Sequence, residues 1–292
     1  MPRIAIFGGT GYLASIIKNQ NNYKKNKYIF FSRKKNSKNY INFSNFEKNV
    51  SFFKKIDFII HLVGPSQNQI KKKNSLGVEK NKITTKICDL CISHNIKLIY
   101  ISSMQIYENY GKSNLSINSK INLRSFYAKS HYESERIILK KFFNYKHMFT
   151  ILRMGNVFGY RKYVDLRELN NNIIHDFCRL ALKQNFFLVK NGSIQRTFIP
   201  SQMFINVINY TIIKRIFNNS IINISYKNYN LKDIALIIQK RFKLIFNSSI
   251  SVKIKKFKYE KKFSVYSNHN YKFKFIVKKI YDEVDQVLKN IK

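Results

Sequence analysis

The first fourteen residues constrain the fold of this chain more than any other segment. The apolar run RIAIFG at residues 3–8 predicts a buried strand, and TGYLASIIKNQ predicts a helix that begins directly after it. Between them, FGGTGYLA at residues 7–14 holds three of the nine glycines of the chain within four residues. This order of strand, glycine turn and helix is typical of the first unit of a parallel α/β sheet.

The remainder of the first half repeats the alternation of strand and helix. The segment at 56–64 is apolar almost throughout, as expected of a strand buried on both faces. Further strands are predicted at residues 28–32, 97–103 and 149–155, and helices at residues 79–94 and 126–144. Beyond residue 156 we predict helices near residues 169–184, 201–215 and 231–243, a strand at 186–189 and a basic C-terminal stretch. The pattern indicates a doubly wound parallel sheet over residues 1–156, with a returning segment near 194–215, and a smaller mixed α/β lobe over residues 157–292.

Composition places the chain in a broad class. Its 292 residues are 45% hydrophobic, which suffices for a buried core and excludes a disordered tail or a disulfide-stapled miniprotein. Only three cysteines are present, which argues against a disulfide framework and indicates a reducing compartment. No apolar run approaches the ~20 residues that a transmembrane helix needs, and the N-terminus has no signal-peptide pattern. We expect a cytoplasmic protein without membrane insertion.

The net charge of +39, from 54 Lys and Arg against 15 Asp and Glu, has two interpretations. One is a polyanionic partner such as nucleic acid. The other is a drift in composition toward Lys, Asn, Ile and Phe, which crowd every segment while Gly and Pro are scarce. Because the lysines run from residue 18 to residue 292 and do not gather on one arm, we favour drift and predict no nucleic-acid partner.

Small residues in the glycine turn point to a bound dinucleotide. Gly8, Gly11 and Ala14 have the spacing G-x-x-G-x-x-A, which allows a tight turn, close approach of backbone N–H groups to a pyrophosphate, and close packing of helix on strand. The N-terminus of the following helix adds N–H donors and a favourable dipole. The cofactor contacts that we predict in this turn are Gly8, Thr10, Gly11, Tyr12 and Leu13.

The end of the second strand bears on which dinucleotide binds. An acidic residue there accepts hydrogen bonds from the adenosine ribose of NAD, whereas a basic residue accommodates the 2′-phosphate of NADP. Ser32 stands in the acidic position and is followed by Arg33 and Lys34. We predict that these three residues contact the cofactor and that NADP(H) is favoured over NAD(H). In so basic a chain, NAD(H) stays an open alternative.

Six segments in order resemble the extended short-chain dehydrogenase/reductases, the NAD(P)-dependent epimerases, dehydratases and reductases of nucleotide sugars. The resemblance covers residues 3 to about 210. Its segments are FGGTGYLA, DFIIHLVGPS (57–66), NKITT (81–85), IYISSMQIYENYG (99–111), LRMGNVFGYR (152–161) and QRTFIP (195–200). It implies a Rossmann-like fold, a nucleotide-sugar substrate and, by analogy, a homodimer through the helix that carries Tyr127.

The resemblance also implies roles for individual residues. Ser103 falls at the position that hydrogen-bonds the reacting sugar oxygen, and Tyr127 falls at the position of the general acid/base. Asn156 and Arg196 fall where the substrate diphosphate is held. The further cofactor contacts that it implies are Leu62, Val63, Gly64, Ser102, Tyr127, His131 and Met154. The further substrate contacts are Ser66, Gln105 and Arg161.

One departure from the family pattern touches the chemistry. The motif is Y-x-x-x-K, but four residues after Tyr127 this chain has His131. Four residues along a helix keep His131 on the same face, whereas Lys129 points elsewhere. An ammonium lowers the pKa of the tyrosine, whose reference value is ~10, but imidazole is mostly neutral at pH 7. Three interpretations stay open. In the first, His131 keeps the contact to the cofactor ribose while another cation, or the positive ring of the cofactor itself, tunes Tyr127. In the second, the enzyme is slow or prefers lower pH, and in the third the redox step is lost while the cofactor still binds.

Other candidates have simpler explanations. Cys88, Cys91 and His94 share one helix, which cannot converge three such ligands on a tetrahedral metal ion, so we predict buried cysteines and no metal site. His61 lies in an apolar strand, and we predict a structural role for it.

The sequence therefore favours an NAD(P)-dependent oxidoreductase or epimerase that transfers hydride at a sugar carbon, with C4 the expected position. The basic end of the second strand tilts this toward a reductase. The alternative is a catalytically weakened dinucleotide-binding protein, a sensor or a partner of another protein, and it rests on His131.

Overall fold

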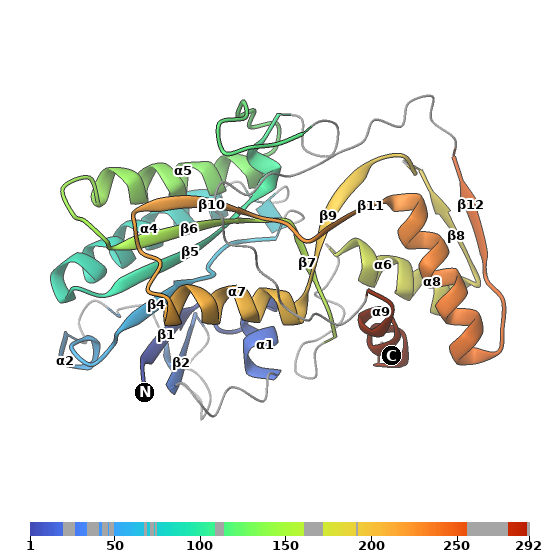
Figure 1. Cartoon of the computed structure of the whole chain (residues 1–292), viewed down its shortest axis with the longest axis horizontal. Coiled ribbons are helices and arrows are strands. Elements are labelled where there is room, and N and C mark those ends of the chain that lie inside the picture. The colour runs from blue at the N-terminus through green and yellow to red at the C-terminus, as the bar shows by residue number, and fades with distance from the viewer. Residues whose placement is uncertain are drawn as a thin grey trace. The chain divides into compact units, whose positions relative to one another are not determined.

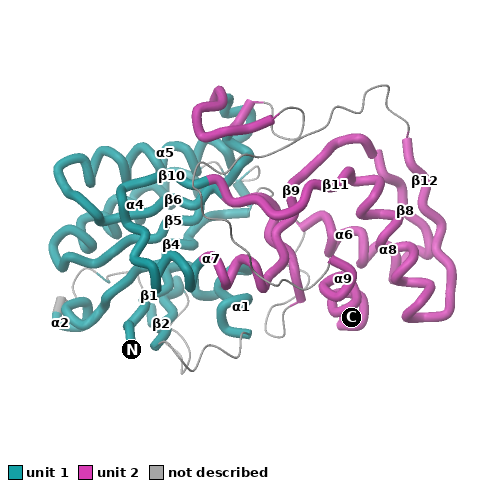
Figure 2. The backbone as a smooth tube through the Cα atoms, viewed as in Figure 1, with its two compact units in different colours: residues 1–106, 122–153, 208–222 teal, residues 107–121, 154–207, 223–292 magenta. Residues whose placement is uncertain are grey.

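The computed structural model describes residues 1–19, 27–33, 41–42, 46, 50–66, 69–70, 73, 75–108, 114–160, 172–190, 192–255 and 280–290. The chain divides into two compact units (Figure 2), which are treated separately below. Unit 1 comprises residues 1–106, 122–153 and 208–222, and unit 2 comprises residues 107–121, 154–207 and 223–292.

A seven-stranded sheet with the order β10-β6-β5-β4-β1-β2-β3 is the centre of unit 1 (Figure 1). Its strands are β1 (Arg3–Phe7), β2 (Lys27–Ser32), β3 (Ile41–Asn42), β4 (Phe58–His61), β5 (Lys97–Ser103), β6 (Phe149–Met154) and β10 (Ser220–Ile224). Strand β1 pairs in parallel with both β2 and β4, and β4 pairs in parallel with β5. Because the strand order reverses between β1 and β4, their carboxyl ends form the switch point where ligands bind in such sheets. The predicted Rossmann-like α/β fold is confirmed.

Helices cover both faces of this sheet. Helices α4 (Ser75–His94) and α5 (Phe126–Lys141) lie on one face and α1 (Tyr12–Asn19) lies on the other, while the short α2 (Val50–Phe53) precedes β4 (Figure 1). Helix α5 begins at a capping residue, Ser125, whose hydroxyl accepts a hydrogen bond from the Ala128 N–H at 3.1 Å. It ends at Lys141, earlier than the predicted residue 144, because Phe142 has left the helical conformation (φ −95°, ψ 13°) and is buried in the core.

Two other boundaries differ from prediction for local reasons. The strand expected at 56–64 is only β4, because Val63 donates its N–H to the His61 ring and so leaves the sheet ladder. Helix α4 begins at Ser75, earlier than the predicted residue 79. The short 3₁₀ turn Met104–Ile106 (η3) follows β5 directly.

Unit 2 contains two small sheets, β11-β9-β7 and β12-β8, with three helices. The strands are β7 (Asn156–Phe158), β8 (Phe186–Val189), β9 (Gln195–Pro200), β11 (Lys227–Asn230) and β12 (Ser251–Ile254). The helices are α6 (Ile173–Gln184), α8 (Leu231–Phe246) and α9 (Ile280–Asn290), and α7 (Ser201–Ile213) runs from this unit into unit 1. The pattern did not predict β9, β11, β12 or α9.

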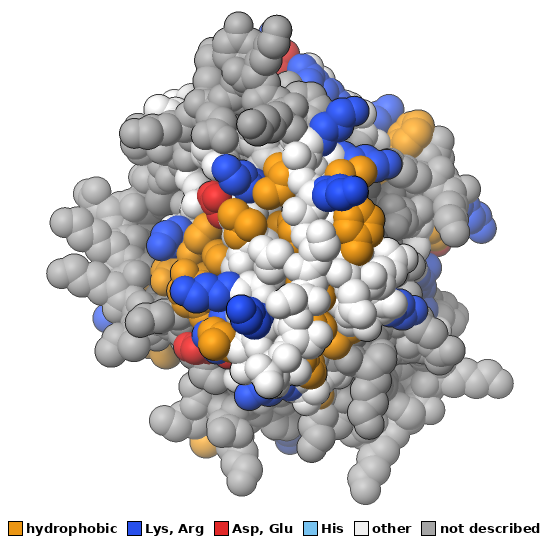
Figure 3. All heavy atoms as spheres, turned by 90° about the vertical axis from the view of Figure 1, so that its right-hand side faces the viewer, with side chains coloured by type: hydrophobic (Ala, Val, Ile, Leu, Met, Phe, Trp, Pro, Cys, Tyr) orange, Lys and Arg blue, Asp and Glu red, His pale blue; other side chains and the backbone are white. Residues whose placement is uncertain are grey.

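Described charged side chains are dispersed on the one face of the molecule that Figure 3 shows. On the face of the molecule in Figure 3, described Lys and Arg side chains lie singly or in small groups between apolar and uncharged ones, and acidic side chains are few. Among the helices that the structure describes, none combines the length and the hydropathy that crossing a membrane requires.

Candidate functional site

The glycine turn lies at the switch point and is closed to any side chain. Gly8 has φ +91°, and a Cβ atom built there would lie 2.9 Å from the carbonyl carbon and oxygen of Leu62. The N–H groups of Gly8 and Gly9 both donate to the carbonyl oxygen of Phe31, at 3.2 and 2.8 Å. The turn is thus held between the ends of β4 and β2. Only glycine fits at residue 8, because both the backbone conformation and the space exclude a side chain.

Helix α1 begins directly after the glycine turn, where its N-terminus can bind a pyrophosphate. The Gly11 N–H donates to Gly8 O at 2.9 Å, and the helix begins at Tyr12. The N–H groups of the first helical residues, such as Leu13 and Ala14, have no acceptor inside the helix, and the helix dipole favours an anion there. These residues fit the predicted dinucleotide, and Thr10, Tyr12 and Leu13 are partly accessible around the turn.

The residues at the end of β2 do not discriminate between NAD and NADP as the cofactor. Ser32 is buried, whereas Arg33 is exposed and forms an ion pair with Glu79 of α4 at 3.5 Å. Exposed pairs of this kind contribute little free energy, so the Arg33 guanidinium can readily exchange its partner for a phosphate. Lys34 lies outside the described residues.

His61 holds the loop 62–64 at the end of β4. Its Nδ1 accepts the Val63 N–H at 3.2 Å, so the ring proton is on Nε2, which lies 2.9 Å from Thr84 Oγ1. Burial, with a smaller contribution from the charge of Lys80, lowers the pKa of His61 to about 3. His61 is therefore neutral and structural, as predicted. Thr84, which replaces the glycine of the family motif, supplies its hydrogen-bond partner.

Ser103 and Tyr127 form a hydrogen-bonded pair. Ser103 Oγ accepts the Gln105 N–H at 3.2 Å, so its own hydroxyl proton is available to the Tyr127 oxygen. Burial raises the pKa of Tyr127 above 10, and the hydrogen bond from Ser103 opposes that shift but does not cancel it. At neutral pH Tyr127 is thus a phenol held in position to give up a proton.

His131 lies beside Tyr127, with ring centroids 4.6 Å apart, which confirms that both occupy one face of α5. Burial first, and then the charges of Lys80 and His61, lower the pKa of His131 well below 6.5. Burial also raises the pKa of Tyr100 well above 10, so Tyr100 keeps its proton, and its hydroxyl forms a hydrogen bond of 3.0 Å with His131 Nδ1. The His131 tautomer sets which of the two groups donates. Lys129, which we predicted to point away from Tyr127, is exposed and lies 3.9 Å from Glu133.

Glu135 ties α5 to two strands of the sheet. It accepts hydrogen bonds from Arg153 Nε at 3.1 Å and Nη2 at 2.7 Å, and from Ser102 Oγ at 2.5 Å. All three residues are buried. The side chain of Ser102 therefore supports the helix that carries Tyr127, and the cofactor contact at Ser102 stays a prediction.

Lys80 is the residue at this site that the sequence did not single out. Its side chain is 1% exposed, with Nζ 3.2 Å from Ser130 O and 5.6 Å from the centroid of the Tyr100 ring. Burial lowers its pKa to about 7, against the opposing charges of Glu135 and Glu133. The available signal was that Lys80 shares one face of α4 with the buried Thr84, Ile87 and Cys91. In a chain with 54 basic residues this signal is easily missed.

The predicted substrate residues are distributed over both units. In unit 2, Asn156 of β7 is paired in register with Phe198 of β9, so Arg196, two residues earlier, lies on the same face of that sheet. Met154 is buried at the end of β6. In unit 1, Ser66 Oγ accepts the Gln69 N–H at 3.3 Å, and Gln105 is half-buried. Arg161 lies outside the described residues.

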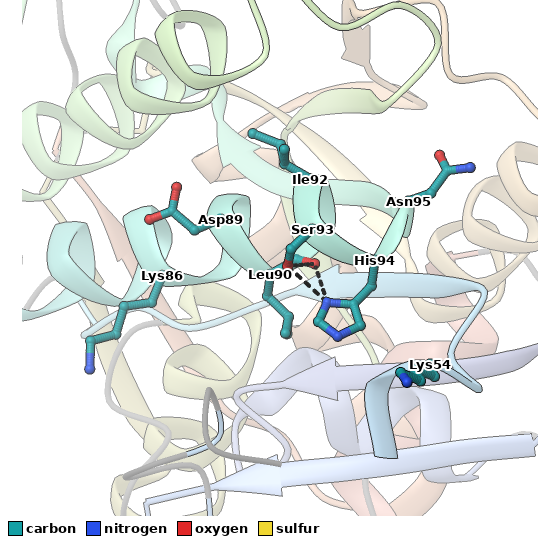
Figure 4. Close-up of a pocket in the computed structure, with 8 residues that line it drawn as sticks. All are labelled: Lys54, Lys86, Asp89, Leu90, Ile92, Ser93, His94 and Asn95. Atoms are coloured by element: carbon teal, nitrogen blue, oxygen red, sulfur yellow. Dashed lines mark hydrogen bonds between the residues drawn. The ribbon is translucent and has the colours of Figure 1, made fainter. Parts of the chain in front are cut away.

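A separate hollow lies at the C-terminal end of α4 and contains none of the predicted site residues (Figure 4). His94 faces it, with Nδ1 2.8 Å from Ser93 Oγ and 3.2 Å from Leu90 O. Cys88 and Cys91 are fully buried in the core, as predicted.

The fold and the site together define a class: a dinucleotide-dependent α/β protein with a serine–tyrosine pair at the carboxyl end of its sheet. The chain belongs to the NAD dependent epimerase/dehydratase family, whose model matches residues 4–224. The resemblance seen in the sequence is thereby confirmed. No curated protein sequence matches the chain.

Solved structures share the fold at low sequence identity. UDP-N-acetylglucosamine 4-epimerase from Bacillus cereus is 18% identical with a TM-score of 0.75, over 99% of both chains. UDP-N-acetylglucosamine 4-epimerase from Methanobrevibacter ruminantium, in complex with UDP-N-acetylmuramic acid, is 21% identical with a TM-score of 0.76, over 99% of this chain and 97% of that one. dTDP-glucose 4,6-dehydratase from Bacillus anthracis, in complex with NAD, is 14% identical with a TM-score of 0.76, over 99% and 96%.

Proposed function

We propose that the protein is an NAD(P)-dependent oxidoreductase or epimerase that acts on a nucleotide-activated sugar, with hydride transfer at C4 and Tyr127 as the acid/base. The observation that carries this proposal is the Ser103–Tyr127 hydrogen bond at the end of β5, on the strand next to the switch point. The names of the similar structures, which are UDP-sugar epimerases and a dTDP-sugar dehydratase, support the substrate class.

The residues of the chain divide the proton chemistry between them. A bound nicotinamide supplies the acceptor or donor of hydride. Tyr127, kept protonated by its raised pKa, donates to the oxygen of a sugar carbonyl as the carbon is reduced. In the oxidising direction the same phenol must first lose its proton, and the Ser103 hydroxyl, which favours the phenolate, assists that loss.

We propose, on the family pattern, that Asn156 and Arg196 contact the diphosphate of the substrate. Asn156 and Arg196, on one face of the β11-β9-β7 sheet, supply an amide and a guanidinium suited to a diphosphate. Arg161, Ser66 and Gln105 are proposed as further substrate contacts on the family pattern alone. We keep NADP(H) as the preferred cofactor because of Arg33, and we place the protein in the cytoplasm.

A homodimer is supported by exposed apolar side chains on the neighbouring helices α4 and α5 and in the turn that follows α5. Val78, Phe126 and Phe143 are 58%, 52% and 86% exposed, and Leu139 is 41% exposed. Light scattering of the purified protein should give twice the monomer mass, and a monomer at micromolar concentration would contradict this assignment.

The test of function is turnover with matched variants. The purified protein should bind NADPH or NADH, measured by quenching of nicotinamide fluorescence, and should convert at least one member of a panel of UDP- and dTDP-hexoses and their 4-keto forms. Tyr127→Phe should keep cofactor affinity but lose about 10²–10⁴-fold in kcat, the usual contribution of a general acid/base. Cofactor binding without turnover of any sugar would favour the non-catalytic dinucleotide-binding function.

A further inference from the structure

His131 of α5 stands at the position of the family lysine, and the buried Lys80 of α4 lies close enough to lower the pKa of His131. We propose that Lys80 supplies the positive charge of the acid–base site and acts on Tyr127 through His131, as a positioning residue. This inference rests on the proposed function, since it concerns the same tyrosine. It corresponds to the first of the three interpretations that the His131 replacement leaves open.

Burial of the Lys80 ammonium lowers the stability of the folded protein, and a functional role for its charge would explain why it is buried. An ammonium has three N–H donors, and among the described residues Ser130 O is the acceptor within hydrogen-bond distance of Nζ. The aliphatic chain passes under the loop after β4, where Cδ and Cε lie 3.7 Å from a Cβ built at Gly64. A buried lysine with so few partners is destabilising as a cation, and such groups cluster at functional sites.

The groups that face Lys80 form one connected cluster within unit 1. The Lys80 ammonium lies over the Tyr100 ring, Tyr100 hydrogen-bonds His131, and His131 contacts Tyr127 edge to face. The titratable groups that face Lys80 are His61 of β4, Tyr100 of β5, and His131, Glu133 and Glu135 of α5, whereas Tyr127 is reached through Tyr100 and His131.

The cluster holds one positive charge, on Lys80. With Lys80 protonated, a second cation on His131 is disfavoured, so His131 stays neutral and has one ring N–H to donate. A neutral imidazole beside the Lys80 ammonium gives Tyr127 the electrostatic support for proton loss that imidazole alone lacks. Because burial lowers the pKa of Lys80 to about 7, this support should weaken as the pH rises above 7.

The first test needs neither cofactor nor sugar. In the wild-type protein, NMR of the Lys80 ammonium should show titration near pH 7, and the His131 ring should be neutral at that pH. In Lys80→Met the pKa of His131 should rise, because a nearby like charge is removed. Lys82→Met is the matched control: it removes the same charge from the same helix at an exposed position and should leave His131 unchanged.

The second test moves the lysine from position 80 of α4 to position 131 of α5. Lys80→Met should lower kcat at least 10-fold with little change in KM, and should remove the inflection of the kcat profile near pH 7. Combining Lys80→Met with His131→Lys, which restores the family lysine, should recover most of that loss. A merely structural Lys80 would not be rescued by a lysine on another helix.

The outcomes separate this inference from the proposed function. If no sugar is turned over but Lys80 titrates near pH 7 and its removal shifts His131, the cluster stands and the function is wrong. If sugars are turned over but Lys80 titrates near 10, or the double variant stays as slow as Lys80→Met, this inference is wrong. If Lys80→Met does not fold, the titration of Lys80 in the wild-type protein tests the inference: a pKa near 7 supports it and a pKa near 10 contradicts it.

Discussion

The buried ion pair between Arg153 and Glu135 allows a quantitative test of how the catalytic helix is held. The side chains are 5% and 1% exposed, and two hydrogen bonds of 3.1 and 2.7 Å join them. Truncating Arg153 to Met keeps the length of the side chain but leaves the Glu135 carboxylate buried with Ser102 as its remaining described partner. Breaking one side of a buried pair costs ~3–5 kcal/mol in free energy of unfolding.

The measurement is urea denaturation followed by circular dichroism, with the slope m compared between variants. The control is Arg241→Met, which removes the same group from the Arg241–Asp285 pair of unit 2, where the side chains are 27% and 17% exposed. This partly solvated pair should cost only ~0.2–1 kcal/mol. The double variant Arg153→Met with Glu135→Leu should recover most of the loss, because it removes the uncompensated charge. An Arg153→Met cost no larger than that of the control would refute this reasoning.

Three further predictions follow from single positions. Gly8→Ala should weaken NAD(P)H binding at least 10-fold and cost ~1–3 kcal/mol of stability, because the new Cβ meets Leu62 at a φ of +91°; unchanged affinity by fluorescence titration would contradict the placement of the cofactor. Acidification should destabilise the fold: His61 has a pKa of about 3 when folded and ~6.5 when unfolded, so its contribution is complete above pH 6.5 and is lost toward pH 3, at up to ~1.4 kcal/mol per pH unit. Urea midpoints of His61→Gln should show a flatter pH dependence than those of wild type. Arg33→Ala should raise the Kd for NADPH about 10-fold and leave that for NADH unchanged; equal effects on both would count against a 2′-phosphate contact at Arg33.

The local sequence pattern was sufficient to predict the main elements around the candidate site. The glycine turn, the order of strands in the first half and the shared face of Tyr127 and His131 all follow from contacts within a few residues, which sequence spacing records directly. The N-terminal cap of α5 at Ser125 is a signal of the same local kind.

The second unit shows where local pattern fails. Strands β9 and β11 pair across about 30 residues, and β12 pairs with β8 across more than 60, so no short-range periodicity reports them. These strands are also short, four to six residues each, and exposure does not alternate along β9 or β11.

The sequence by itself determined that a dinucleotide fold occurs in this chain and predicted Tyr127 as its acid/base, because both depend on residue types at fixed local spacing. Only the tertiary structure revealed the buried ammonium that we propose accompanies that tyrosine. Lys80 and Ser130 are 50 residues apart, and Arg153 and Glu135 are 18 apart, and only the packing of α4 and α5 on the sheet brings these groups together. Among 54 basic residues, what distinguishes Lys80 is its burial, and burial is a property of the folded chain.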